Sequence, residues 1–229
     1  MADYIDKNII TQAYLHLDIP DLSDDELTLL KEQLNMFVRS RTDFFLYSEA
    51  EISIEFREGS LKVYATILGT IGALYTGVAQ YSDFRVSSQL LYNDVKRLSD
   101  YIVAESLYIT KARHKETTHI EARVGVIGSI QKINTTLSSI IKMNGQKPVH
   151  KMSKKIIEAN NEIKKLFSNL KNENDRELVA NGILSIAKQI SSEPIQTKTE
   201  ANSDNRVEIL KYKKSRIILI STVSSVINK

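Results

Sequence analysis

The stretch that opens at residue 51 reads Glu51-Ile52-Ser53-Ile54-Glu55-Phe56-Arg57, and after Glu58-Gly59-Ser60 the chain continues Leu61-Lys62-Val63-Tyr64-Ala65. Apolar and polar side chains alternate in both halves, and the three residues between them have the composition of a turn. Alternation on either side of a short turn predicts a β-hairpin. We therefore expect a hairpin over about residues 51–65, with Ile52, Ile54 and Phe56 on one face.

The hairpin leads into an uncharged run. From Val63 to Ser82, 20 successive residues carry no charge, about the number that a helix needs to cross a bilayer. Small residues recur every fourth position, a spacing that lets membrane helices pack closely: Ala65, Gly69, Ala73 and Gly77. Polar residues dilute the run, which favours a helix that lines a pore over a single lipid anchor. A buried core helix of a soluble bundle is the alternative.

Helical periodicity dominates the rest of the chain. We expect a first helix from about Ile5 to Leu17 and a second that a capping box opens at Ser23 and Glu26. Further helices are expected over about 84–109, 121–143, 151–170 and 175–190, with a break at Asn144-Gly145. The tail over 207–220 predicts two short strands around a basic turn, and a terminal helix is the alternative. The expected fold is mainly α, a multi-helix bundle with a β-hairpin and a short C-terminal strand pair.

The charge is distributed unevenly along the chain. Residues 1–60 hold 13 acidic and 5 basic side chains, a net charge of −8, whereas residues 61–229 hold 15 acidic and 26 basic ones, a net charge of +11. This pattern suggests three parts. They are acidic N-terminal helices over 1–48, the hairpin, apolar helix and long helix over 49–110, and a basic helical region with short C-terminal strands over 111–229.

The basic excess is greatest between Lys111 and Lys171, where 13 Lys and Arg face four Glu. Such a block can neutralise the phosphates of a nucleic acid or of another polyanion. It can also dock on anionic lipid headgroups, and solvated helix faces are the plainer alternative. The candidate ligand-binding or nucleic-acid-binding residues are Lys111, Arg113, Lys115, Arg123, Lys132, Lys151, Lys154 and Lys155.

Catalytic and metal-binding signatures do not occur in the sequence. There is no Cys, and the four His residues lack the spacing of a metal site. No glycine loop precedes a Lys-Ser or Lys-Thr helix start, and no Ser lies in a nucleophile elbow. We expect no enzyme activity, no metal and no cofactor. The first residues lack a signal peptide, so we expect the protein to start in the cytoplasm.

Residues 54–63, the segment from Gly69 to Gly77, and Tyr81-Ser-Asp-Phe84-Arg85 with Asp94 together resemble small membrane-acting effectors of bacterial anti-phage defence, most closely those of the Hailong system. The similarity covers about residues 50–130. It implies a homo-oligomeric channel, such as a tetramer, held inactive by a short DNA oligomer that a partner nucleotidyltransferase makes. It also implies a move from the cytoplasm to the inner membrane on activation. It assigns no ligand-binding residues.

Two functions therefore stand as expectations. The first is an abortive-infection effector that forms an oligomeric membrane ion channel and is regulated by a bound anionic ligand such as a DNA oligomer. In this account the small-residue stripe packs the helices together and the basic block binds the regulator. The second is a soluble helical binding or regulatory module, antitoxin-like or nucleic-acid-binding, in which residues 63–82 are a core helix.

Overall fold

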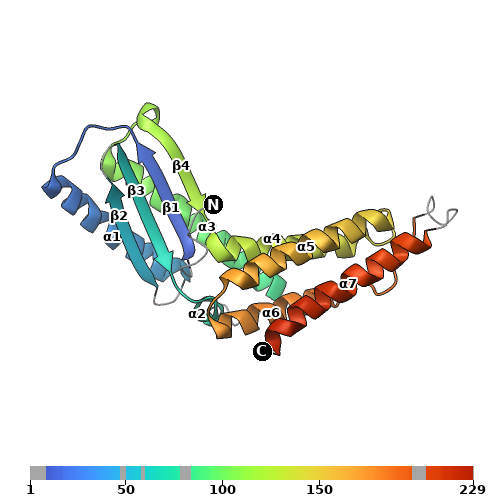
Figure 1. Cartoon of the computed structure of the whole chain (residues 1–229). Helices are drawn as coiled ribbons and strands as arrows, with labels where there is room; N and C mark the ends of the chain where they lie inside the picture. Colours follow the sequence, from blue (N-terminus) through green and yellow to red (C-terminus); the bar gives the residue numbers. More distant parts are fainter. Residues whose placement is uncertain (1–8, 47–49, 58–59, 78–83, 198–204, 229) are drawn as a thin grey trace. The chain divides into compact units, whose positions relative to one another are not determined.

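The computed structural model describes residues 9–46, 50–57, 60–77, 84–197 and 205–228 (Figure 1). Helices hold about 67% of the described residues, and four strands form one antiparallel sheet. The chain divides into two compact units, Met1–Gly128 (unit 1) and Ser129–Lys229 (unit 2). The expected three-part division at residues 48 and 110 stays a prediction.

Unit 1 contains the sheet, whose strand order is β2-β3-β1-β4. The strands are β1 (Ile9–Leu17), β2 (Glu51–Arg57), β3 (Leu61–Leu68) and β4 (Thr117–Arg123), and the helices are α1 (Asp24–Leu46), the short α2 (Ile71–Gly77), α3 (Phe84–Thr110) and the 3-10 turn η2 (His114–Glu116). With α2 left aside, the succession is β-α-β-β-α-β, the split β-α-β or ferredoxin-like arrangement.

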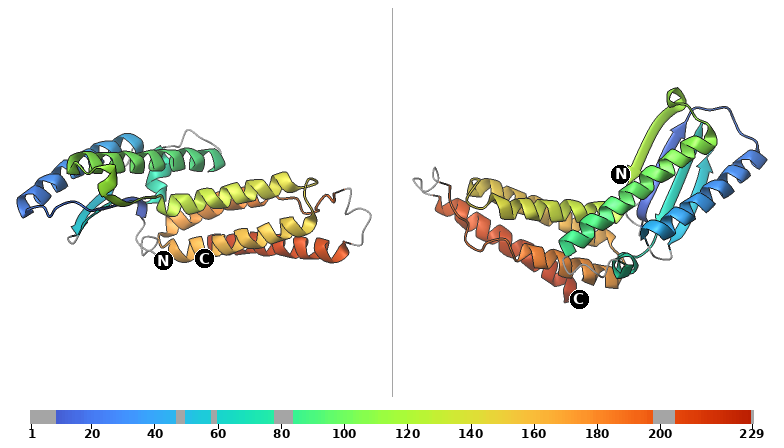
Figure 2. Two further views of the ribbon diagram at one scale, coloured as in Figure 1. Left: turned by 90° about the horizontal axis from the view of Figure 1, so that it is seen from above. Right: turned by 180° about the vertical axis from the view of Figure 1, so that it is seen from behind.

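One face of the sheet carries the core of unit 1. Leu15 and Leu17 of β1 and Val63 and Ile67 of β3 are fully buried on this face, and α1 and α3 both lie against it (Figure 2). Because successive strand residues point to opposite faces, the side chains between these positions point away from the two helices. In the described part of unit 1, both long helices therefore leave the other face of the sheet open.

Three predictions for unit 1 are confirmed. The hairpin is present as β2 and β3, with Ile52, Ile54 and Phe56 opposite Ile67, Ala65 and Val63. The capping box opens α1, since the Ser23 backbone N–H donates to Glu26 Oε2 at 2.9 Å and the Glu26 N–H donates to Ser23 Oγ at 3.4 Å. The long helix expected over 84–109 is α3.

The helix expected from Ile5 to Leu17 is wrong, because residues 9–17 form the central strand β1. Residues 5–8 lie outside the described residues. Ile9, Ala13 and Leu17 recur every fourth position, which fits one face of a helix and also one face of a strand. Pairing with β3 on one side and β4 on the other makes this segment a strand. In the strand, the polar residues Gln12 and His16 point to the face opposite to Ala13 and Leu17.

The single apolar helix expected over 63–82 is also wrong for the described residues. Alternation continues through β3 to Leu68, so Ala65 lies in a strand. Gly69 follows β3, where an added Cβ would lie 2.7 Å from Ile10 Cδ1, and Ala73 and Gly77 lie in the seven-residue α2. The four small residues therefore do not share one helix face, and residues 78–82 lie outside the described residues.

Unit 2 is built from helices. They are α4 (Gly125–Met143), which starts at the end of unit 1, α5 (Val149–Asn169), α6 (Glu173–Ala187) and α7 (Arg206–Ile227). The predicted break at Asn144-Gly145 is confirmed between α4 and α5. Residues 121–123, expected to start a helix, end β4 instead. Ile133, Ile156, Ile183 and Leu219 are fully buried, one from each helix.

The C-terminal strand pair is wrong, and the alternative of a terminal helix is confirmed as α7. The β-branched run Ile217-Ile218-Leu219-Ile220 favours a strand locally. Tyr212, Ser215, Leu219 and Val223 recur at helical spacing and are all buried, so α7 packs on α5 and α6. The mainly helical class is confirmed, but the fold is an α/β mix and not a helical bundle with a hairpin.

Replacing Gly125 with Ala is expected to destabilise unit 1 by about 2 kcal/mol or more. Gly125 has φ of +42°, and an added Cβ would lie 2.2 Å from the backbone oxygen of Ile9 at the start of β1. A left-handed non-glycine residue alone costs about 1–2 kcal/mol, and the backbone must also move. Gly128→Ala in the same helix is the control, because its Cβ meets only the Val124 side chain. Denaturant unfolding measures both, and equal stabilities would contradict the prediction.

Candidate nucleic-acid interface

The open face is the side of the sheet that points away from α1 and α3. The strand register places its side chains in cross-strand rows, because directly opposed residues point to the same face. Its members are Gln12, Tyr14 and His16 on β1, Glu51, Ser53, Glu55 and Arg57 on β2, Lys62, Tyr64, Thr66 and Leu68 on β3, and His119, Glu121 and Arg123 on β4.

Two tyrosines lie at the centre of the open face. Tyr14 on β1 is directly opposite Tyr64 on β3, and their ring centroids are 4.8 Å apart with an interplanar angle of 36°. The ring of His119 on β4 lies 5.7 Å from that of Tyr14. All three side chains are partly or largely exposed. The central strands thus present a connected aromatic surface that continues onto β4.

An arginine lies over each tyrosine ring. The guanidinium carbon of Arg57 is 4.7 Å from the centroid of Tyr64, and that of Arg123 is 5.3 Å from the centroid of Tyr14. Glu55 accepts from Arg57 Nη2 at 3.1 Å, and Glu121 accepts from Arg123 Nη2 at 2.6 Å. These carboxylates hold the two guanidinium groups beside the rings.

A chain of hydrogen bonds crosses three strands next to the tyrosines. Arg123 Nη1 donates to Gln12 Oε1 at 2.8 Å, and Gln12 Nε2 donates to Thr66 Oγ1 at 2.8 Å. Both ends of the Gln12 amide are thus engaged by neighbours. Gln12 therefore positions Arg123 over Tyr14, and one N–H and one oxygen lone pair of its amide are already used.

The surroundings shift the pKa of two groups on the open face, the Tyr14 phenol and the Glu121 carboxylate. Burial raises the pKa of the Tyr14 phenol, and the neighbouring Tyr64 raises it further. The hydrogen bond from Arg123 holds the pKa of Glu121 below its usual range. At neutral pH the phenol is therefore uncharged and Glu121 is ionised, so the Tyr14, Arg123 and Glu121 arrangement persists there.

Four of the eight basic candidates belong to unit 1. Arg123 lies on the open face. Lys111, Arg113 and Lys115 lie in the connection from α3 to β4, and Lys111 has a φ of 54°. That connection reaches the end of β1, where the Asp18 N–H donates to the Glu116 carbonyl at 2.7 Å. We call Lys111, Arg113 and Lys115 the basic rim, because their connection borders the end of β1, where His16 is paired with Lys62.

The other four candidates belong to unit 2 and are not part of the open face. Lys132 pairs with Glu162 at 3.1 Å between α4 and α5. Lys155 donates to Ser139 Oγ at 2.8 Å between the same two helices. Lys151 and Lys154 are exposed on α5. Two of these lysines thus hold the helix pair together, and two face solvent.

Sequence reasoning missed the tyrosine pair and Arg57. The reason is the first strand: once residues 5–17 are expected to be helical, Tyr14 has no place on a sheet. A signal was present, because Gln12, Tyr14 and His16 alternate with Ala13, Leu15 and Leu17. Tyr64 and Arg57 already lay in the predicted hairpin, on the face opposite to Ile54 and Phe56.

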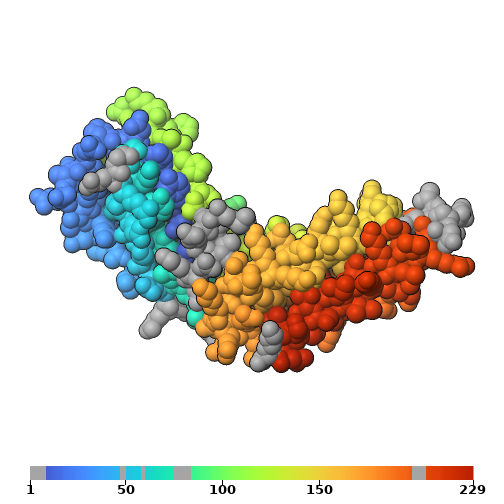
Figure 3. Space-filling model, in the orientation of Figure 1, coloured from blue at the N-terminus to red at the C-terminus, as the bar shows by residue number. Residues whose placement is uncertain are grey.

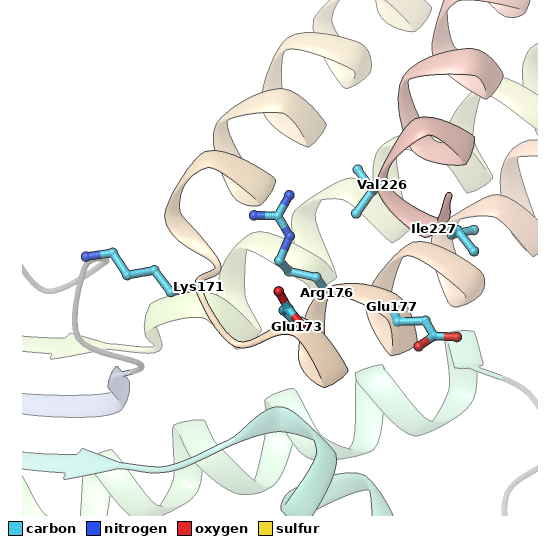
Figure 4. A pocket seen from close by; sticks show the side chains of 6 residues that line it. All are labelled: Lys171, Glu173, Arg176, Glu177, Val226 and Ile227. Carbon is cyan, nitrogen blue, oxygen red and sulfur yellow. The ribbon is translucent and has the colours of Figure 1, made fainter. Parts of the chain in front are cut away.

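Unit 2 has a separate pocket of about 320 Å³ near the start of α6 and the end of α7 (Figure 4). Two basic, two acidic and two apolar residues line it: Lys171, Glu173, Arg176, Glu177, Val226 and Ile227. Arg176 donates to the carbonyls of Phe167 and Leu170 at 3.2 Å each, so it caps the C-terminal end of α5.

No described helix is long and apolar enough to cross a membrane. The described residues also contain no group of three or more His, Asp or Glu that could hold a metal ion. No protein-family model, curated protein or solved structure matches the chain.

Proposed function

We propose that unit 1 binds single-stranded nucleic acid on its open face. The observation that carries the proposal is the Tyr14 and Tyr64 pair, 4.8 Å apart on the two central strands, with an arginine over each ring. Aromatic side chains stack unpaired bases, and each stack contributes about 1–3 kcal/mol. Arginine adds stacking and a charge that reaches phosphates.

The form of the nucleic acid follows from the geometry of the site. Bases in a duplex are paired and stacked on one another, so aromatic side chains on a sheet surface reach them only in a single strand. The basic rim and Lys62 offer charges for the phosphates at one end of the platform. Because the Gln12 amide is already engaged, we expect weak discrimination among bases.

The layout is analogous to the RNA-recognition motif, a four-stranded sheet whose aromatic side chains stack two or three bases. The analogy concerns the arrangement of strands and rings alone, since a fold does not fix a function. Strand β3 reads Leu-Lys-Val-Tyr-Ala-Thr-Ile-Leu, which is not the consensus of the corresponding strand in that motif.

A binding titration tests the proposal. Fluorescence anisotropy with a labelled single strand of about ten nucleotides should show tighter binding than with a duplex of the same sequence, because only the single strand offers base faces. We expect Arg57→Gln with Arg123→Gln to weaken single-strand binding about tenfold or more. The exposed Arg39 on α1 provides the control, since Arg39→Gln should leave affinity unchanged. Preference for the duplex would contradict the proposal.

The anti-phage channel effector stays a prediction. An oligonucleotide platform is compatible with its regulation by a bound DNA oligomer. The membrane step relied on one helix over 63–82, and the described part of that segment is divided between β3 and α2. The nucleotidyltransferase partner, the homo-oligomer and the move from cytoplasm to inner membrane also stay predictions, as does the absence of enzyme activity.

A further inference from the structure

Helix α7 is apolar on two opposite faces. Its inner face packs on α5 and α6 through Tyr212, Leu219 and Val223, which are buried. Its outer face carries four exposed apolar side chains: Val207, Leu210, Ile217 and Ile218, with 42–74% of each accessible. Helix α7 lies at the surface of unit 2 (Figure 3), so these outer side chains are not covered within the unit. The outer face is therefore a candidate docking surface.

At 100° per residue, the outer face of α7 also includes two exposed lysines, Lys211 and Lys214. They lie between the apolar positions Leu210 and Ile217. The face thus combines an apolar stripe with positive charge, and a matching partner needs an apolar stripe flanked by carboxylates.

The outer face of α1 has that composition. Leu34, Val38 and Leu46 on its inner face are buried, whereas Leu29, Met36 and Phe44 are 55%, 67% and 64% exposed. The same outer face carries three exposed carboxylates, Asp25, Glu32 and Asp43, and one exposed cation, Arg39, so its net charge is negative. Single exposed apolar residues need no explanation, but a stripe of them along one helix indicates an interaction site.

The two outer faces also match in spacing. Leu29 and Met36 are seven residues apart, as are Leu210 and Ile217, so both pairs recur after about two helical turns, or about 10 Å. When the two helices run parallel with Leu29 beside Leu210, Met36 lies beside Ile217. Glu32, between Leu29 and Met36, then lies level with Lys211 and Lys214, which lie between Leu210 and Ile217.

We propose that the α1 outer face of one copy of this protein docks on the α7 outer face of a second copy. The argument for a second copy is that both complementary surfaces occur on one chain, with opposite charges and equal spacing. Because the two surfaces differ, the contact is heterologous and generates a head-to-tail ring or an open filament. The proposal does not depend on nucleic-acid binding.

Sedimentation velocity on the full chain, from about 1 to 100 μM, tests this docking. The wild-type protein should assemble as concentration rises. Lys211→Glu with Lys214→Glu places carboxylates opposite Glu32, and Glu32→Lys with Gln33→Lys places cations opposite the two lysines. Each double variant should lose association at least about tenfold. An equimolar mixture of the two variants should assemble again, since the acidic α7 of one then meets the basic α1 of the other.

Lys154→Glu with Lys165→Glu on the exposed face of α5 is the matched control and should assemble as the wild type does. Unchanged thermal unfolding shows that each variant is folded. A wild-type protein that stays monomeric over this range would overturn the proposal, as would charge variants that assemble normally or a mixture that stays dissociated. Monomeric protein that binds lipid vesicles would instead assign the α7 face to a membrane surface.

Discussion

Replacing both Tyr14 and Tyr64 with Ala is expected to abolish measurable binding of short single strands at micromolar protein. Each ring supplies one stacking surface, and loss of one stack costs about 1–3 kcal/mol, or roughly 5- to 150-fold in affinity. The two rings are in contact, so their effects need not add. Fluorescence anisotropy with the wild type, both single variants and the double variant measures the loss and the coupling between the rings.

Phe at both positions is the decisive control, because Phe keeps the stacking surface and removes the hydroxyl. We expect the double Phe variant to bind within a few-fold of the wild type. Tyr108→Ala serves as a second control, since Tyr108 on α3 is 78% exposed and lies outside the open face. A double Ala variant that is folded and binds with unchanged affinity would show that the open face does not hold the bases.

Leu15→Ala is expected to lower the free energy of unfolding of unit 1 by about 2–5 kcal/mol. Leu15 lies on a central strand, two residues before its end, and is fully buried between the sheet and its helices. Truncation of a buried Leu removes its transfer free energy and leaves a cavity. Denaturant unfolding followed by circular dichroism measures the change.

Ile120 provides a control of nearly equal size in the same cross-strand row. It is the register partner of Leu15 on β4, but 42% of it is exposed. Ile120→Ala should therefore cost less than about 1 kcal/mol. If both substitutions had equal effects, the placement of β1 at the centre of the sheet would be wrong.

Local signals in the sequence predicted most of the separate elements. The hairpin follows from strict alternation around a turn, and α1 follows from the capping box at Ser23 and Glu26. Helices α3, α5 and α6 also lie near their expected ranges. In each case the deciding interactions lie within a few residues along the chain, which is the distance over which patterns are informative.

The sheet could not be predicted in this way, because its centre is made by residues far apart in sequence. Strand β1 pairs with β3, for example Tyr14 with Tyr64, and with β4, for example Gln12 with Arg123. In isolation, Ile9, Ala13 and Leu17 fit a helix as well as a strand. The tyrosine platform depends on those two pairings, so it was missed together with β1.

The basic candidates show the same limit. A count of charge between Lys111 and Lys171 treats the segment as one surface, but β4 and the start of α4 divide it between the two units. Arg123 lies on the open face, whereas Lys132 and Lys155 connect α4 to α5. The composition of residues 111–171 shows that the segment has a net positive charge, but it does not show on which surface each basic side chain lies.

The most direct test of the central claim is a crosslinking map. A single strand that contains 5-iodouracil is bound to the full chain and irradiated, and the attached peptides are identified by mass spectrometry. The claim predicts crosslinks at Tyr14 or Tyr64, and loss of both in the double Ala variant. Crosslinks confined to residues outside the open face, such as Lys151 and Lys154 on α5, would contradict it.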